Sequence, residues 1–485
     1  KYNPDLFVSL SSLQKGNLYR LEDVRKTFDA FSGLNQFRYV NIRFWKNELA
    51  GSNKLDCIIN LAPMTKQSVS FDIEGTNTSG NLGVAGNLNY QHRNLFRNAE
   101  IFRINLKGAM EHQQWIENNI INDFNTREAG IESSLSIPRL VGPGNWFRYF
   151  DKYLPQTVFT LGYNYQDRPD YTRTISNFKI GYNWKTTENL WHTFNIIDFN
   201  MVNLYAFDPG FINLIKDLYI KSSFTDHLIF ATNYSMVYNT QKLNEHNNYK
   251  YLKFSFESAG NVLNLLSSAF GADKMESSDT LGIRTSNYYE IFNTRFAQYV
   301  KADLEFRYGL MVDRYNSVVG RIFAGVGIPF GNFDVLPFEK KYFTGGANGI
   351  RAWQVRSLGP GTYKAPTNAY PNQSSDIKLE ANLEYRFRLI KMMEGAVFLD
   401  AGNIWAINDK DNREGAKFEI NKFYKQIAIG TGIGFRFDFN YFVFRLDLGM
   451  KLRDPSQEFG KGWIIGNRKL NNDDFNISFA IGYPF

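Results

Sequence analysis

The stretch FNISFAIGYPF, residues 475–485, decides the fold class of this chain. Odd-numbered positions hold only Phe, Ile or Tyr, whereas even-numbered positions hold Asn, Ser, Ala, Gly and Pro. A period of two indicates a β-strand whose two faces meet different surroundings. A strand of a soluble β-sandwich is usually shorter than these eleven residues. The pattern predicts a membrane-spanning strand that runs to Phe485.

The same alternation recurs through most of the chain. In residues 377–387, apolar side chains alternate with Lys378, Glu380, Asn382, Glu384 and Arg386. Near the start, Val69, Phe71 and Ile73 alternate with polar residues. An apolar face opposite a charged face suits a barrel with lipid outside and water inside.

The number of alternating spans also fits a barrel. They start near residues 66, 81, 99, 126, 156, 174, 190, 223, 248, 295, 316, 376, 394, 425, 440 and 475. That is sixteen, an even number, as bacterial single-chain barrels require. We therefore expect an all-β transmembrane barrel of about 16 antiparallel strands over residues 65–485.

Composition agrees with this interpretation but does not prove it. Aromatic residues make up 16% of the 485 residues, yet the mean hydropathy is −0.37. No stretch approaches the ~18 uninterrupted apolar residues of a membrane helix. A large soluble β protein has a similar composition. The net charge of +7 is spread along the chain without a basic block, which argues against a nucleic-acid partner.

Loop lengths predict the orientation. Connections near 204–222, 259–293, 328–375, 406–424 and 453–474 are long, and those near 313–315, 388–393 and 438–440 are short. Outer-membrane barrels have short periplasmic turns and long outer loops. Both chain ends should then lie on the periplasmic side, with an export signal upstream of Lys1. The long connection 139–155 departs from this alternation.

Residues 1–64 do not follow the barrel pattern. Leu21, Val24, Phe28 and Phe31 repeat at helical spacing, and Gly33 is a plausible helix stop. Two strand-like runs follow, at 37–44 and 55–61. We expect a small periplasmic α+β module, incomplete at its N-terminal end.

The longest connection carries the most distinctive motif, YFTGGANGIRAWQVRSLGPGTY at 342–363. Its glycines permit tight turns, whereas its large apolar residues favour burial. This mixture predicts that the loop, residues 330–373, folds back into the lumen. A guanidinium held there needs a carboxylate partner, because an unpaired buried charge costs several kcal/mol.

This loop resembles the lumen-inserted loop of the BamA/TamA superfamily of outer-membrane assembly and translocation barrels. The hallmark Val/Ile-Arg-Gly-Phe/Tyr is met by Ile350, Arg351, Ala352 and Trp353, preceded by Gly345 and Gly346. Here alanine replaces the motif glycine, and the aromatic residue is Trp. The segment GAVFLDAGNIW at 395–405 is similar to the family's strand motif, met by Phe398, Asp400 and Gly402. The resemblance implies that Arg351 pairs with Asp400 and with Glu384.

Further segments resemble the same family. HRNLFRN at 92–98 and IPRLVGPG at 137–144 are similar to its first two periplasmic turns. Residues 15–62 resemble the second half of a POTRA domain, and FAIGYPF resembles a terminal targeting signal. Within the superfamily the loop looks closer to TamA-like lipoproteins of Bacteroidetes, with BamA itself as the alternative.

The resemblance implies a physical mechanism without a cofactor. A seam between the first and last barrel strands would open and accept a client strand by β-augmentation. Phe71 and Ile73 lie on one side of this seam; Gly482, Tyr483, Pro484 and Phe485 lie on the other. Pro484 lacks an amide donor and Gly482 weakens a strand. The implied partners are the outer-membrane bilayer, client outer-membrane or surface proteins, and a TamB-like periplasmic protein or assembly-complex lipoproteins.

The residues leave two other transport functions open and disfavour catalytic, metal and dinucleotide sites. A passive porin and a two-partner-secretion pore are alternatives from the transport class. A catalytic pair of Asp226 and His227 is disfavoured, because adjacent strand residues face opposite sides. The five histidines form no local metal-ligand pair. The GxGxG at 430–434 precedes no helix and should instead allow close packing of the inserted loop.

Overall fold

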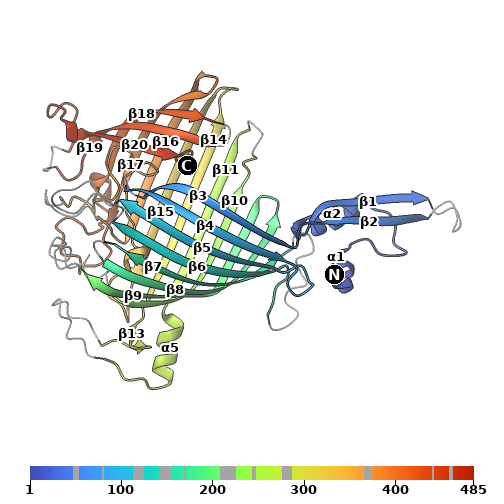
Figure 1. Cartoon of the computed structure of the whole chain (residues 1–485). Helices are drawn as coiled ribbons and strands as arrows, with labels where there is room; N and C mark the ends of the chain where they lie inside the picture. Colours follow the sequence, from blue (N-terminus) through green and yellow to red (C-terminus); the bar gives the residue numbers. More distant parts are fainter. Residues whose placement is uncertain are drawn as a thin grey trace.

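A computed structural model describes most of the chain (Figure 1). The described residues are 1–46, 54–78, 81–112, 125–142, 154–168, 171–207, 225–242, 247–275, 287–364, 373–439, 442–457 and 462–485. Within them, sixteen antiparallel strands form one sheet that curls into a barrel. None of the helices in this part of the chain is long and apolar enough to cross a membrane.

The strand bounds follow the alternating spans of the sequence. They are β3 (Gln67–Thr78), β4 (Asn81–Arg93), β5 (Ile101–His112), β6 (Thr126–Ile137), β7 (Gln156–Asp167), β8 (Tyr171–Thr187), β9 (Leu190–Phe207), β10 (His227–Asn239), β11 (Tyr249–Ala259), β14 (Tyr299–Met311), β15 (Asn316–Pro329), β16 (Ile377–Ile390), β17 (Met393–Trp405), β18 (Ala428–Asp438), β19 (Val443–Arg453) and β20 (Phe475–Ile481). Each observed start lies within 4 residues of its predicted start. The predicted number of strands is confirmed.

Neighbours in sequence pair throughout the sheet, so that β3 and β20 are its two edge strands. Among the described residues, no hydrogen-bonded ladder joins β3 to β20. The sequence led us to expect a closing seam between these strands. The structure leaves that seam unpaired.

Apolar side chains point outward from this barrel and charged side chains point inward, which is the reverse of the arrangement in a soluble barrel. Phe71 on β3 and Ile477 on β20 are 63% and 62% exposed on the outside. Glu384 on β16 and Asp400 on β17 are fully buried inside. Such an apolar exterior suits contact with lipid, and the polar residues gather in the lumen.

The last strand is shorter than predicted. β20 ends at Ile481, and Gly482 adopts the left-handed conformation with φ +86°. The chain then turns inward, and Phe485 packs in the lumen against Tyr249 and Val319. The prediction that the strand runs to Phe485 is therefore wrong. Alternation alone did not reveal that lumenal contacts remove the last residues from the sheet.

Residues before the barrel form a separate module (Figure 1). It contains α1 (Pro4–Leu10), α2 (Leu21–Gly33) and a hairpin of β1 (Phe37–Lys46) and β2 (Leu55–Pro63). The helix and hairpin agree with the sequence prediction, but α1 was not predicted. Phe31 of α2 is buried, whereas Leu21 and Phe28 of the predicted helical face are exposed.

The module contacts the barrel at the turn between β4 and β5. Phe31, Leu34 and Phe37 pack with Ala99 of this turn. Gln36 Nε2 donates a hydrogen bond of 3.0 Å to the Ala99 carbonyl. We call this side of the barrel the module end and the opposite side the loop end. Long connections in the second half of the barrel lie at the loop end, and two-to-four-residue turns lie at the module end.

Candidate functional site in the barrel lumen

The connection between β15 and β16, residues 330–376, enters the lumen from the loop end; its residues 365–372 lie outside the described residues. A short 3-10 helix, η2 (Phe338–Lys340), brings Glu339 to the ring of His227 on β10, at 2.6 Å. Further along, Tyr342 exchanges two backbone hydrogen bonds with Ser375, each 2.8 Å. The hydroxyl of Thr344 donates to Glu380 on β16. These contacts fix the base of the inserted loop.

A compact turn presents the central motif of the loop. Gly345 and Gly346 both have positive φ, at +90° and +81°, which favours glycine. Gly346 N–H donates to the Trp353 carbonyl at 2.7 Å, so that the turn closes around Ile350–Trp353. Ile350, Ala352 and Trp353 are buried together with Leu358 and Ala428. The apolar residues of the motif therefore anchor the loop against the inner wall.

Arg351 is fully buried and reaches two carboxylates. Its Nε and Nη2 atoms donate to the two oxygens of Asp400 at 2.9 Å each, and Nη1 donates to Glu384. The Arg351 backbone N–H also donates to Asp400, at 3.0 Å. The guanidinium carbon lies 3.5 Å from the centre of the Phe398 ring. This bidentate pairing, closed by an aromatic face, suits arginine better than lysine.

The ionic cluster is larger than the sequence analysis anticipated. Arg436 on β18 bonds Glu384 at 3.0 Å and lies 2.9 Å from Asp447 on β19. Arg445, also on β19, lies 3.3 Å from Asp447 and donates to Asn348 of the loop at 2.7 Å. All three are buried at the lumenal face of β18 and β19, and the curled sheet brings them beside Arg351.

Glycines of β18 and β19 make room for the loop. A Cβ at Gly430 would lie 2.6 Å from the Ala352 side chain. A Cβ at Gly449 would lie 2.7 Å from the Arg351 carbonyl oxygen and 2.8 Å from the Ala352 backbone. The backbone of the loop thus lies directly on the wall. A Cβ at Gly402 of the strand motif would lie 2.9 Å from the Glu380 Cα, so this position also requires glycine.

The last strand and the last residues also contact the loop. Asn476 of β20 donates to the Arg351 carbonyl at 2.8 Å. The Phe485 ring centre lies 5.9 Å from the Arg351 guanidinium and 5.7 Å from that of Arg386. Tyr483 donates to Glu394 of β17 at 2.9 Å. One edge of the sheet is therefore tied to the inserted loop.

Comparisons with known proteins agree with this arrangement. Residues 67–485 match the model of the Omp85 superfamily domain. This chain belongs to the Omp85 superfamily. It is accordingly an outer-membrane barrel of the kind that inserts or translocates proteins.

Solved structures share the fold of this Omp85 barrel at low sequence identity. The crystal structure of BamA from Haemophilus ducreyi lacking POTRA domains 1-3 has a TM-score of 0.62 at 13% identity, over 99% of this chain and 82% of that chain. CdiB from Acinetobacter baumannii has a TM-score of 0.51 at 12% identity, over 99% and 71%. CdiB from Escherichia coli has a TM-score of 0.53 at 11% identity, over 99% and 73%.

The residues predicted for the β3 side of the seam lie away from the Arg351 cluster in this Omp85 barrel. Phe71 and Ile73 project from the outer face of β3 and do not join the Arg351 cluster. Pro484 lies in the inward turn after β20. The structure thus gathers the loop motif, its two acids and Phe485 at one site, whereas Tyr483 bonds Glu394 and the residues of β3 stay apart.

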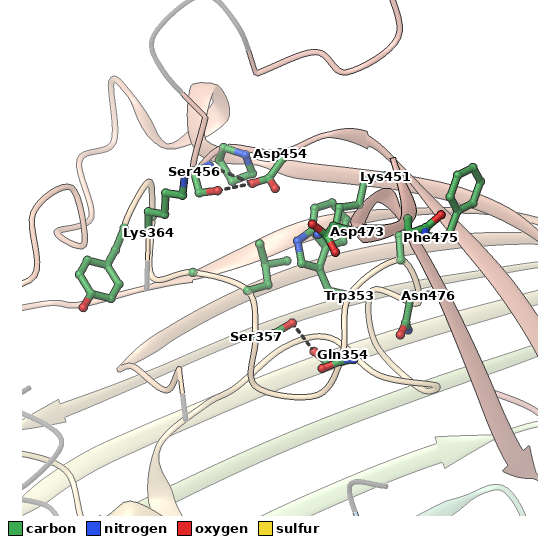
Figure 2. Close-up of a pocket in the computed structure, with 17 residues that line it drawn as sticks. Trp353, Gln354, Ser357, Lys364, Lys451, Asp454, Ser456, Asp473, Phe475 and Asn476 are labelled. Carbon is green, nitrogen blue, oxygen red and sulfur yellow. Dashed lines mark hydrogen bonds between the residues drawn. The ribbon is translucent and has the colours of Figure 1, made fainter. Parts of the chain in front are cut away.

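A pocket of about 450 Å³ opens beside the site at the loop end (Figure 2). The inserted loop forms one side through Trp353 and Lys364, and Lys451 of β19 and Phe475 of β20 also line it. Lys451 Nζ lies 5.3 Å from the centre of the Trp353 ring. The pocket thus lies between the inserted loop and the beginning of β20, next to the hydrogen bond from Asn476 to the Arg351 carbonyl.

The adjacent residues Asp226 and His227 bond to different partners. His227 faces the lumen and bonds Glu339, whereas Asp226 accepts a 2.7 Å hydrogen bond from the Leu204 N–H. Burial alone would raise the pKa of Glu339, but the charge and hydrogen bond of His227 outweigh burial and hold this pKa at about 2. This carboxylate serves as an anchor of the loop.

Proposed function

We propose that this Omp85 protein inserts or exports client proteins through the seam between β3 and β20, by adding a client strand to the sheet edge. The proposal rests on one observation: in the described part of the chain, no ladder of backbone hydrogen bonds joins these two strands. Every other neighbouring pair of barrel strands is hydrogen-bonded. The seam is thus the place where the wall can admit another strand.

The two edges differ in length, which favours β3 as the receiving edge. β3 spans 12 residues, whereas β20 spans 7 and then turns away at Gly482. Backbone N–H and C=O groups that face lipid without partners cost several kcal/mol each. A client strand that pairs with β3 would satisfy both its own groups and those of the edge. The energy for insertion would then come from hydrogen bonding and burial in lipid, without a nucleotide.

The inserted loop would control the position of β20. Arg351, held by Asp400 and Glu384, presents its carbonyl to Asn476 and its guanidinium to the Phe485 ring. Movement of the loop would release these contacts and free the last strand. We therefore assign Arg351 and its two acids the role of holding the loop and, through it, one side of the seam.

We further propose that the module of residues 1–64 is part of a periplasmic POTRA domain that receives clients. Its helix followed by a hairpin, and its packing on the β4–β5 turn, support this assignment. The loop sequence, with alanine in place of the motif glycine, favours a TamA-like protein. A TamB-like periplasmic protein would then be its partner, rather than assembly-complex lipoproteins. Co-purification of the full-length protein with one or the other partner distinguishes these two roles.

Photo-cross-linking tests the receiving edge. The cross-linking amino acid p-benzoylphenylalanine replaces Phe71 on β3, and a urea-unfolded eight-stranded outer-membrane barrel serves as the client. The control position is Leu106 on β5, which faces outward like Phe71 but lies two strands from the edge. Adducts should form at position 71 and be weak at position 106. Equal adducts at both positions, or none at either during productive insertion, would overturn the proposal.

A further inference from the structure

Residues 260–275 and 287–298 of the connection between β11 and β14, here called the flap, leave the sheet and fold against the outside of the barrel. Gly260, with φ +72°, redirects the chain into the helix α5 (Asn261–Ala269). A Cβ at Gly260 would lie 2.9 Å from the Gln298 Cα, so this turn requires glycine. A two-residue-strand hairpin of β12 (Glu290–Ile291) and β13 (Thr294–Arg295) follows. Figure 1 shows α5 and β13 beside the wall, toward the loop end.

The inner side of this flap covers apolar residues that would otherwise face lipid. His227 and Ile229 of β10 face the lumen, so the alternate residues Leu228 and Phe230 face outward. Leu228 is nevertheless 0% exposed, because Tyr289 and Phe296 of the flap pack on it. Leu263 of α5 joins the same cluster. The flap is therefore attached to the lipid-facing side of the wall.

The outer side of α5 is an apolar stripe. Val262, Leu265, Leu266 and Ala269 are exposed at positions i, i+3, i+4 and i+7, which lie on one face of a helix. Leu265 is 70% exposed, and Phe270, directly after the helix, is 84% exposed. The helix sequence NVLNLLSSA contains no charged residue. Contiguous exposed apolar surface of this kind marks an interaction site.

The hairpin presents a second apolar group beside the first. Phe292 lies at its tip and is 75% exposed. Phe292 and Asn293 both have positive φ, at 54° and 56°, so the tip is a tight turn that projects the aromatic ring. Ile291, next to Phe292, packs in the cluster that includes Leu263 of α5. The helix that bears the stripe and the hairpin that bears Phe292 thus pack on the same cluster.

We propose that this flap is a membrane-surface anchor, in which α5 and Phe292 insert into the boundary between headgroups and acyl chains of the outer leaflet. The apolar stripe is continuous with the lipid-facing wall, since α5 follows β11 directly and packs through Leu263 on the outward face of β10. Amphipathic helices can lie at this boundary with a face of Leu and Phe side chains buried in it. The anchor would fix the depth of the wall on the side of the barrel away from the seam, because β10 and β11 lie in the middle of the sheet and β3 and β20 form its edges.

Fluorescence quenching in vesicles tests the anchor. The full chain with Cys57→Ser and Phe270→Cys carries an environment-sensitive nitrobenzoxadiazole label and is reconstituted in phosphatidylcholine vesicles. Cys57 is the sole cysteine, so the label is unique. The matched reference is Asp409→Cys in the β17–β18 connection, where the native side chain is 81% exposed. Both sites are exposed and outside the strands, which limits effects on folding.

Lipids with nitroxide groups at shallow depth should quench the label at position 270 several-fold more than the label at position 409. Aqueous iodide should show the opposite order. Strong iodide quenching at position 270 without lipid quenching would overturn the proposal. Quenching that appears only at high protein-to-lipid ratio would also overturn it, since a second copy would then be the occupant. Neither outcome bears on client insertion at the seam, which has its own cross-linking test.

Discussion

At the scale of single residues, Arg351 holds the inserted loop against the barrel wall. It is the centre of a cluster with Glu384 and Asp400, and Arg436, Arg445 and Asp447 extend the cluster across the wall. Burial of so many charges is unfavourable unless each is paired. The buried arginine of the loop therefore needs the carboxylates of the wall as partners, and those carboxylates need the arginine.

Arg351→Ala should release the loop. The substitution leaves the buried carboxylate of Asp400 without its cationic partner and removes one of the arginines bound to Glu384, a loss of about 3–5 kcal/mol for a broken buried pair. Trypsin should then cleave the loop at Arg356 or Lys364 in folded protein. Arg314→Ala in the exposed β14–β15 turn is the control and should keep the protection of the wild type. If the Arg351→Ala loop stayed protected, the assigned role of the cluster would be wrong.

Gly449→Ala tests the close contact of loop and wall. The added Cβ would meet the backbone of Arg351 and Ala352, which cannot yield as a flexible side chain does. We expect a loss of about 1–3 kcal/mol from overpacking, measured as a lower thermal unfolding midpoint. Gly108→Ala on β5 is the matched control, since its Cβ would meet nothing within 4 Å. Equal stability of the two variants would mean that the loop does not lie against β19.

At the scale of elements, sequence periodicity predicted the strands well and their ends less well. Strand starts agree because apolar and charged faces must alternate wherever lipid and lumen flank the wall. The end of β20 was missed, because its inward turn depends on the contact of Phe485 with Tyr249 and Val319. Alternation also did not reveal that Arg436, Arg445 and Asp447 meet the Arg351 cluster, because that depends on how the sheet curves around the loop.

The helix η2 gives the loop a second, pH-sensitive anchor. The folded pKa of Glu339 is about 2, below the value of ~4.3 for an unperturbed glutamate. A depressed pKa adds stability above the unfolded value, and this contribution is lost as the pH falls toward the folded value. Wild type should therefore unfold at a higher temperature than Glu339→Gln at pH 6. The difference should shrink between about pH 4.3 and pH 2. A difference independent of pH would contradict an ionic anchor.

At the scale of the whole molecule, the lumen is occupied rather than open. The inserted loop, its ionic cluster and Phe485 all lie inside the wall. A passive porin needs a continuous water-filled path instead. We expect small, unsteady currents from the wild type in planar bilayers, and larger ones from Arg351→Ala. A large, steady current from the wild type would favour the porin alternative.

The proposed function requires that β3 and β20 part at the seam before a client strand is inserted. A scan of cysteine pairs between residues 68–74 and 476–480, on a Cys57→Ser background, would find one that forms a disulfide across the seam. The control disulfide joins Leu448→Cys and Ile477→Cys, neighbours in the β19–β20 ladder, and leaves the seam free.

The decisive measurement is client insertion by the seam-locked protein, before and after reduction of the disulfide. We predict that the locked protein inserts no client, that reduction restores insertion, and that the control disulfide has little effect. Full insertion by the oxidised, seam-locked protein would show that the seam need not part.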